Sequence, residues 1–111
     1  MKNIDEKYML IALKEAKKAA IKDEVPVGAI IVKNNKIIAK AHNKKEVTKI
    51  ATHHAEILVI NKACKKLGDW RLNDCSIYVT LEPCDMCMGA IKESRINKLI
   101  YAAKNVIKKQ T

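Results

Sequence analysis

Residues 78–87, which read YVTLEPCDMC, contain the pattern that decides the fold of this chain. The apolar, β-branched run over residues 76–80 predicts a short buried strand. Pro83 then marks the start of a helix, since proline is favoured at the first helical position. Cys84 and Cys87 are three residues apart on that helix, so both sulfurs lie on one face. Near a helix N-terminus the dipole favours the thiolate, which is the form that binds metal. The segment therefore predicts a strand that leads into a pair of metal ligands.

A second cluster, HAE at residues 54–56, lies near the start of another expected helix over residues 53–67. We expect Thr52 to cap this helix and Gly68 to end it. Imidazole and thiolate together suit zinc, and three protein ligands leave a fourth position open for water. Zinc lowers the pKa of bound water from about 15.7 to about 7. Glu56 lies two residues from His54, so it can take the proton of that water without being a ligand.

The prediction is therefore one catalytic zinc per chain, with His54, Cys84 and Cys87 as ligands and Glu56 as the proton carrier. Each cluster taken alone has other interpretations. A Cys-x-x-Cys pair also occurs in redox centres and as half of a zinc finger, and many His-x-Glu pairs are solvated helix residues.

The other cysteines and histidines are expected outside the metal site. Cys64 and Cys75 are predicted to be packed core thiols, because cysteine is often buried. His42 and His53 are predicted to be surface or loop residues rather than further ligands.

The rest of the chain alternates between helical and extended patterns. We expect a helix over residues 3–21, strands over 27–32, 37–42 and 98–102, a tight turn at Asn34 and Asn35, a loop over 43–51, and a helix from Pro83 to about residue 94. Strands that alternate with helices predict an α/β fold with helices on both faces of the sheet. With 111 residues, the chain is expected to form a single domain, and residues 104–111 a basic tail.

The net charge of +10 favours polyanionic partners such as nucleic acid, although a Lys-rich composition bias would explain it equally well. Asp5, Glu6 and Lys7 interrupt any signal-peptide pattern, and no apolar segment is long enough to span a membrane. We therefore expect a cytoplasmic protein with reduced thiols and no membrane partner.

The combination of His-x-Glu with Pro-Cys-x-x-Cys is the signature of zinc-dependent nucleobase deaminases. The chain resembles the cytidine deaminase superfamily and, within it, the bacterial tRNA adenosine deaminases. The resemblance extends from about residue 9 to residue 103, through EVPVGA at 24–29, DWRL at 69–72, YVTLEPC at 78–84, GA at 89–90 and SRI at 94–96.

This resemblance implies a three-layer α/β/α cytidine deaminase-like fold with a mixed central sheet. It also implies hydrolytic deamination of adenosine to inosine at the wobble position of a tRNA, binding of the anticodon arm, and a homodimer. The family match further places four residues at the substrate: Val27, Asn43, Glu82 and Asn105. For three of these a structural role is the alternative, since Val27 suits a strand core, Asn43 a turn and Glu82 a solvated loop.

The chain stops earlier than the proteins it resembles, so we expect a C-terminally truncated fold with an open sheet edge at residues 98–102. Two other functions remain open. One is deamination of a free base or nucleoside, such as guanine, cytosine or cytidine. The other is a zinc-binding subunit without catalysis, against which Glu56 argues, because a structural site needs no carboxylate there.

Overall fold

The computed structural model describes residues 2–104, and Asn105 and the rest of the expected basic tail lie outside them. The elements follow in the order α1 Lys2–Ile21, β1 Gly28–Lys33, β2 Lys36–His42, α2 Lys45–Thr48, α3 Ala55–Leu67, β3 Cys75–Leu81, α4 Asp85–Glu93 and β4 Lys98–Ala103.

The four strands form one mixed sheet in the order β2-β1-β3-β4. Strand β1 is antiparallel to both β2 and β3, whereas β3 and β4 are parallel and are joined by α4. A parallel pair needs such a crossover, which explains why the helix that carries the cysteines lies between these strands. The mixed sheet confirms the expectation from the sequence.

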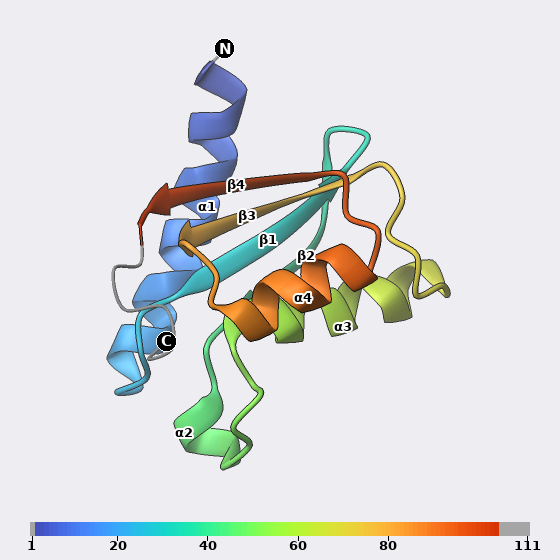
Figure 1. Cartoon of the computed structure of the whole chain (residues 1–111). Helices are drawn as coiled ribbons and strands as arrows, with labels where there is room; N and C mark the ends of the chain where they lie inside the picture. The colour runs from blue at the N-terminus through green and yellow to red at the C-terminus, as the bar shows by residue number, and fades with distance from the viewer. Residues whose placement is uncertain (1, 105–111) are drawn as a thin grey trace.

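Helices cover both faces of the sheet, with α1 on one side and α3 and α4 on the other (Figure 1). Side chains alternate accordingly along β1. Ile30 and Val32 pack with Tyr8 of α1, whereas Ile31 packs with Val59 of α3. The three-layer α/β/α architecture is confirmed.

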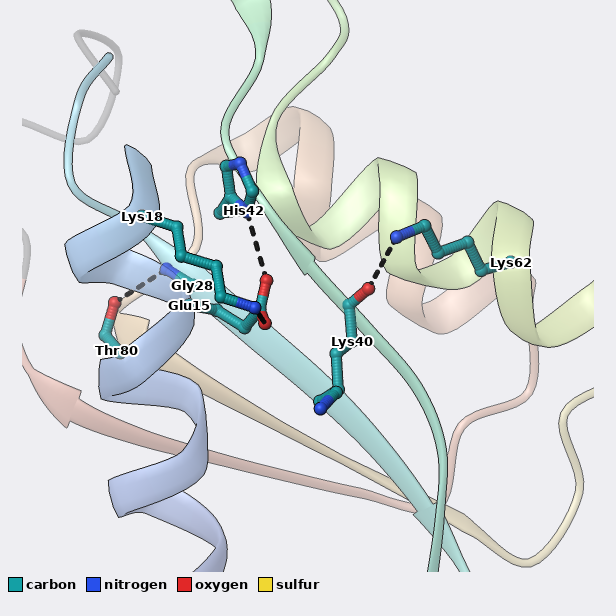
Figure 2. Close-up of polar contacts among 7 residues, drawn as sticks. All are labelled: Glu15, Lys18, Gly28, Lys40, His42, Lys62 and Thr80. Carbon is teal, nitrogen blue, oxygen red and sulfur yellow. Dashed lines mark hydrogen bonds and ion pairs between the residues drawn. The ribbon is translucent and has the colours of Figure 1, made fainter. Parts of the chain in front are cut away.

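Gly28, the first residue of β1, allows α1 to approach the sheet closely. Its backbone N–H donates to the Thr80 hydroxyl at 3.1 Å (Figure 2). A Cβ at this position would overlap the Ala12 carbonyl oxygen and would lie 2.5 Å from the Ala16 nitrogen. The absence of a side chain at residue 28 is therefore a condition for the packing of α1 on β1.

A buried hydrogen bond between Glu15 and His42 joins the middle of α1 to the end of β2. The Glu15 carboxylate lies 3.0 Å from His42 Nδ1 and 2.8 Å from Lys18 Nζ (Figure 2). His42 is only 8% exposed, so the expectation of a surface or loop histidine was wrong for this residue. Glu15, 27 residues away in the chain, makes the burial of His42 possible by supplying a hydrogen-bond partner.

Several boundaries differ from the prediction. The loop expected over 43–51 contains the short helix α2, and α3 begins at Ala55 with His54, rather than Thr52, as its N-cap. Helix α4 begins at Asp85 with Cys84 as its N-cap, so Pro83 precedes the helix instead of opening it. The N-caps His54 and Cys84 both have the extended backbone that is usual at this position, and both are predicted metal ligands.

Other local predictions hold. Asn34 and Asn35 adopt positive φ values of 52° and 61° in the β1–β2 turn, and Gly68 ends α3 with a φ of 69°. Among residues 2–104, strand β4 stands at the end of the strand order and is half exposed, which agrees with the edge position expected there. Within residues 2–104, no helix is long and apolar enough to span a membrane.

Candidate active site

The N-termini of α3 and α4 lie close together beside the carboxyl end of β3, and each presents one of the predicted ligands (Figure 1). The carbonyl of His54 accepts the first helical hydrogen bond of α3 from Leu58, and the carbonyl of Cys84 does the same for α4 through Met88. Neither cap uses its side chain on its own helix. Both side chains are therefore available to bind a metal ion.

His54 Nδ1 lies 3.7 Å from Cys84 Sγ and 3.5 Å from Cys87 Sγ. A tetrahedral zinc ion with bonds of about 2.3 Å to sulfur and about 2.1 Å to nitrogen would separate these atoms by about 3.6 Å. All three side chains are buried, and their ligand atoms lie within 4.8 Å of one another. Among the described residues this is the one group of three or more potential metal ligands, and its spacing fits zinc.

Burial determines the protonation of two of these ligands. Burial, with the charge of Lys45 as a smaller cause, lowers the pKa of His54, so this imidazole stays neutral as a metal ligand must. Burial also raises the pKa of the Cys87 thiol, and the nearby Glu56 and Cys84 raise it further. The expected effect of the helix N-terminus on Cys87 is therefore outweighed by burial, so the thiolate would need a cation beside it to be stable.

Glu56 is the second residue of α3 and is 3% exposed. Burial raises the pKa of its carboxyl group, and hydrogen bonds with its own backbone and with Cys87 offset this only partly. A carboxyl group with a raised pKa can both accept and return a proton near neutral pH, which is the property required of a proton carrier.

A small inner cavity of about 10 Å³ adjoins Glu56 and is lined by Val25, Val27, Asn43, His54, Ala55 and Glu56. This volume is near the minimum that holds a single water molecule. Val27 and Asn43 thus line the same cavity as His54 and Glu56, and their contact with a nucleoside stays a prediction. Val25 was missed, although its position two residues before Val27 in an extended segment is a signal that would have found it.

A larger outer groove of about 390 Å³ also borders His54. It is lined by Lys45, Ala51, Thr52, His54, Cys84, Asp85 and Met86. Its volume is in the range of small-molecule sites, and His54 borders both hollows. Nothing in the sequence pattern indicated Lys45, because its position depends on how α2 folds.

Asn43 is a buried turn residue whose side chain is hydrogen-bonded to the backbone. It is 4% exposed, its side-chain oxygen accepts the Lys45 N–H at 3.2 Å, and its side-chain nitrogen donates to the Val25 carbonyl at 3.5 Å. These bonds give Asn43 the structural role that was weighed as the alternative, at a position that also borders the inner cavity.

Glu82 lies outside the linings of both hollows, and its backbone N–H donates to the Ala103 carbonyl at 2.8 Å. Asn105 lies outside the described residues. For these two residues a contact with substrate stays a prediction.

The remaining cysteines do not join the metal group. Cys75 is fully buried, as expected of a core thiol, and Cys64 is half buried with its thiol 3.8 Å from the Trp70 carbonyl. His53 is half buried in the turn before His54.

Comparison with known proteins supports this arrangement. The family model described as MafB19-like deaminase matches residues 3–110. A tRNA-specific adenosine deaminase of Bacillus subtilis is 56% identical over 99 residues, which are 89% of this chain and 62% of that protein. The chain thus spans about three fifths of the length of this curated relative.

Solved structures agree with the sequence relatives. A structure from work on A-to-I editing by tRNA:A34 deaminases matches with a TM-score of 0.91 and 44% identity, over 93% of this chain and 75% of that one. A guanine deaminase from Bacillus subtilis matches with a TM-score of 0.87 and 40% identity, over 89% of this chain and 64% of that one.

Proposed function

Because the chain belongs to the MafB19-like deaminase family, where its relatives include tRNA-specific adenosine deaminases, we propose that it converts adenosine to inosine in a transfer RNA, at the wobble position. The observation that carries this proposal is the grouping of His54, Cys84 and Cys87 around one point, with the buried Glu56 beside them. The assignment of transfer RNA as the substrate rests on the 56% identical relative and on the tRNA:A34 deaminase structure.

His54, Cys84 and Cys87 would hold one zinc ion per chain. When bound, zinc supplies the Lewis acidity that makes hydroxide available near neutral pH. Val27 and Asn43 would contact the nucleoside where it borders the inner cavity, whose volume is that of about one water molecule. A purine does not fit a hollow of that size, so the base would enter from the outer groove.

Glu56 would move the protons of the reaction. Its carboxylate takes a proton from the attacking water as the oxygen bonds to C6 of adenine, and it gives this proton to the ring nitrogen N1. It then transfers the second proton of the water to the exocyclic nitrogen as the C6–N bond breaks. Ammonia leaves, the oxygen stays on C6, and adenosine plus water has become inosine plus ammonia.

We also propose that the protein works in the cytoplasm and acts as a homodimer that binds the anticodon arm, with Glu82 and Asn105 at the substrate. The net charge of +10 supports an RNA partner, because lysine and arginine side chains neutralise phosphates.

Inosine formation in an anticodon stem-loop with a wobble adenosine tests the function. The zinc-loaded wild type should form inosine, and Glu56→Gln should lower the rate by about 10²- to 10⁴-fold while keeping its zinc. Glu93→Gln, which removes an exposed carboxylate at the far end of α4, is the matched control and should keep full activity. Equal activity of the two variants would exclude the proposed role of Glu56.

Deamination of guanine is the second candidate, because the Bacillus subtilis guanine deaminase shares the fold at 40% identity. If the same zinc-loaded protein released ammonia from guanine and formed no inosine in the stem-loop, guanine deamination would be the supported function.

A further inference from the structure

Glu24 is a buried acid that the proposed chemistry does not use. It lies between α1 and β1, in the EVPVGA segment, and is 5% exposed. An ionised carboxylate at such a position needs hydrogen-bond donors to offset the loss of water. The hydrogen-bond donors that contact Glu24 therefore indicate its role in the structure.

Both carboxylate oxygens of Glu24 accept backbone N–H groups of α2. The Glu46 N–H lies 2.9 Å from Oε1, and the Val47 N–H lies 2.8 Å from Oε2. Hydrogen bonds to a charged acceptor are about twice as strong as neutral ones. The contact spans 22 and 23 residues of sequence and ties α2 to the segment before β1.

Helix α2 depends on outside support. It has four residues, none of them buried, and its N-cap Lys44 makes no side-chain capping bond. A single helical turn is unstable alone, because nucleation fixes several residues for one hydrogen bond. The paired bonds from Glu24 supply the partners that the turn itself lacks.

The position of α2 matters because residues at its start line both of the hollows that border His54. Asn43, just before α2, lines the inner cavity, and Lys45, its first residue, lines the outer groove. The Asn43 side chain also bonds the Lys45 N–H and the Val25 carbonyl, and Val25 directly follows Glu24. A displacement of α2 would therefore change the lining of both the inner cavity and the outer groove.

We propose that Glu24 is a positioning residue for substrate binding. Its two hydrogen bonds to α2, called the brace below, hold Asn43 at the inner cavity and Lys45 at the outer groove. Glu24 acts through α2 and does not touch the reacting atoms. The inference rests on the proposed function for its kinetic consequence, but the brace itself can be observed without activity.

Glu24→Gln tests the brace, because it keeps the volume of the side chain and replaces one acceptor oxygen by an NH₂ group that faces a backbone N–H. Glu15→Gln is the matched control, since Glu15 is equally buried at 5% but bonds His42 and Lys18 instead of α2. Both variants are compared with the wild type as zinc-loaded, full-length protein.

The first measurement is the ¹⁵N–¹H spectrum with amide hydrogen exchange. In Glu24→Gln, but not in the control, we expect faster exchange at Glu46 and Val47 and shifted resonances for Asn43 and Lys45. Unchanged resonances at Asn43 and Lys45 would overturn the proposal, whether or not the wild type edits RNA.

The second measurement is the kinetics on the stem-loop. We expect KM to rise about tenfold, the factor that corresponds to about 1.4 kcal/mol, with kcat changed less than about twofold. A general loss of folded protein would instead lower the apparent kcat at constant KM. That result, or an equal KM for Glu24→Gln and Glu15→Gln, would also overturn the proposal. If the wild type formed no inosine, the proposed function would be refuted. The ¹⁵N–¹H spectrum and the amide exchange rates would then still test whether Glu24 positions α2.

Discussion

Replacing Gly28 with alanine should destabilise the protein by about 3 kcal/mol, the upper end of what overpacking usually costs. The new methyl group would overlap the Ala12 carbonyl oxygen, and it would lie 2.5 Å from the Ala16 nitrogen and 2.8 Å from Glu15 Cβ. Two of these three neighbours are backbone atoms of one helix. They cannot move by a change of rotamer, so the whole of α1 must retreat from β1.

The magnitude follows from what such a retreat exposes. Tyr8 and Ala12 of α1 pack on Ile30, Val32 and Tyr78, and a displaced helix loosens all of these contacts together. For a domain of this size, a loss of about 3 kcal/mol corresponds to a fall in Tm of roughly 10–15 °C. It is also a large fraction of the 5–15 kcal/mol that is typical of folded domains.

Thermal and urea unfolding of the zinc-loaded proteins would measure this difference. Gly89→Ala is the matched control, because nothing lies within 4 Å of a Cβ at that position of α4. Alanine there should stabilise the protein by about 1 kcal/mol through its higher helix propensity. If Gly28→Ala changed the stability by less than about 0.5 kcal/mol, the close approach of α1 and β1 would be refuted.

Two further predictions concern charge and metal. Burial raises the pKa of Glu15, but hydrogen bonds from His42 and Lys18 outweigh it, so the net pKa lies below the usual 4.5. The stability gained is present above about pH 4.5 and disappears as the pH falls through the lowered pKa, so the difference in Tm between wild type and Glu15→Gln should shrink in acid. Cys87→Ser should abolish stoichiometric zinc binding, measured by atomic emission. It should also remove the stabilisation by zinc, which is about 4 kcal/mol when free zinc exceeds its Kd a thousandfold, so that added zinc no longer raises Tm.

Much of the fold could be predicted because it follows from local patterns. The continuous β-branched run of Ile30, Ile31 and Val32 identifies a buried strand, and Asn34 with Asn35 identifies the turn that follows. Helix starts were predicted less well. His54 and Cys84 proved to be N-caps, although neither is a usual capping residue and neither makes a side-chain capping bond.

The acids show most clearly where local reasoning stops. Glu56 could be assigned from its spacing to His54. Glu15 has one partner in its own helix, Lys18, but its buried partner His42 is 27 residues away, and the α2 N–H groups that bond Glu24 are 22 and 23 residues away. A pattern within one helix or loop carries no information on such pairs.

The sequence by itself indicated the candidate metal site, because zinc ligands are recognised by residue type and by short spacings such as those of His54 with Glu56 and Cys84 with Cys87. The tertiary structure alone decided the size of the inner cavity, the burial that raises the pKa of Glu56, and the brace from Glu24 to α2. The physical reason is that burial and long-range hydrogen bonds depend on which segments the folded chain brings together, and these contacts exist only once the sheet and its two helical layers have formed.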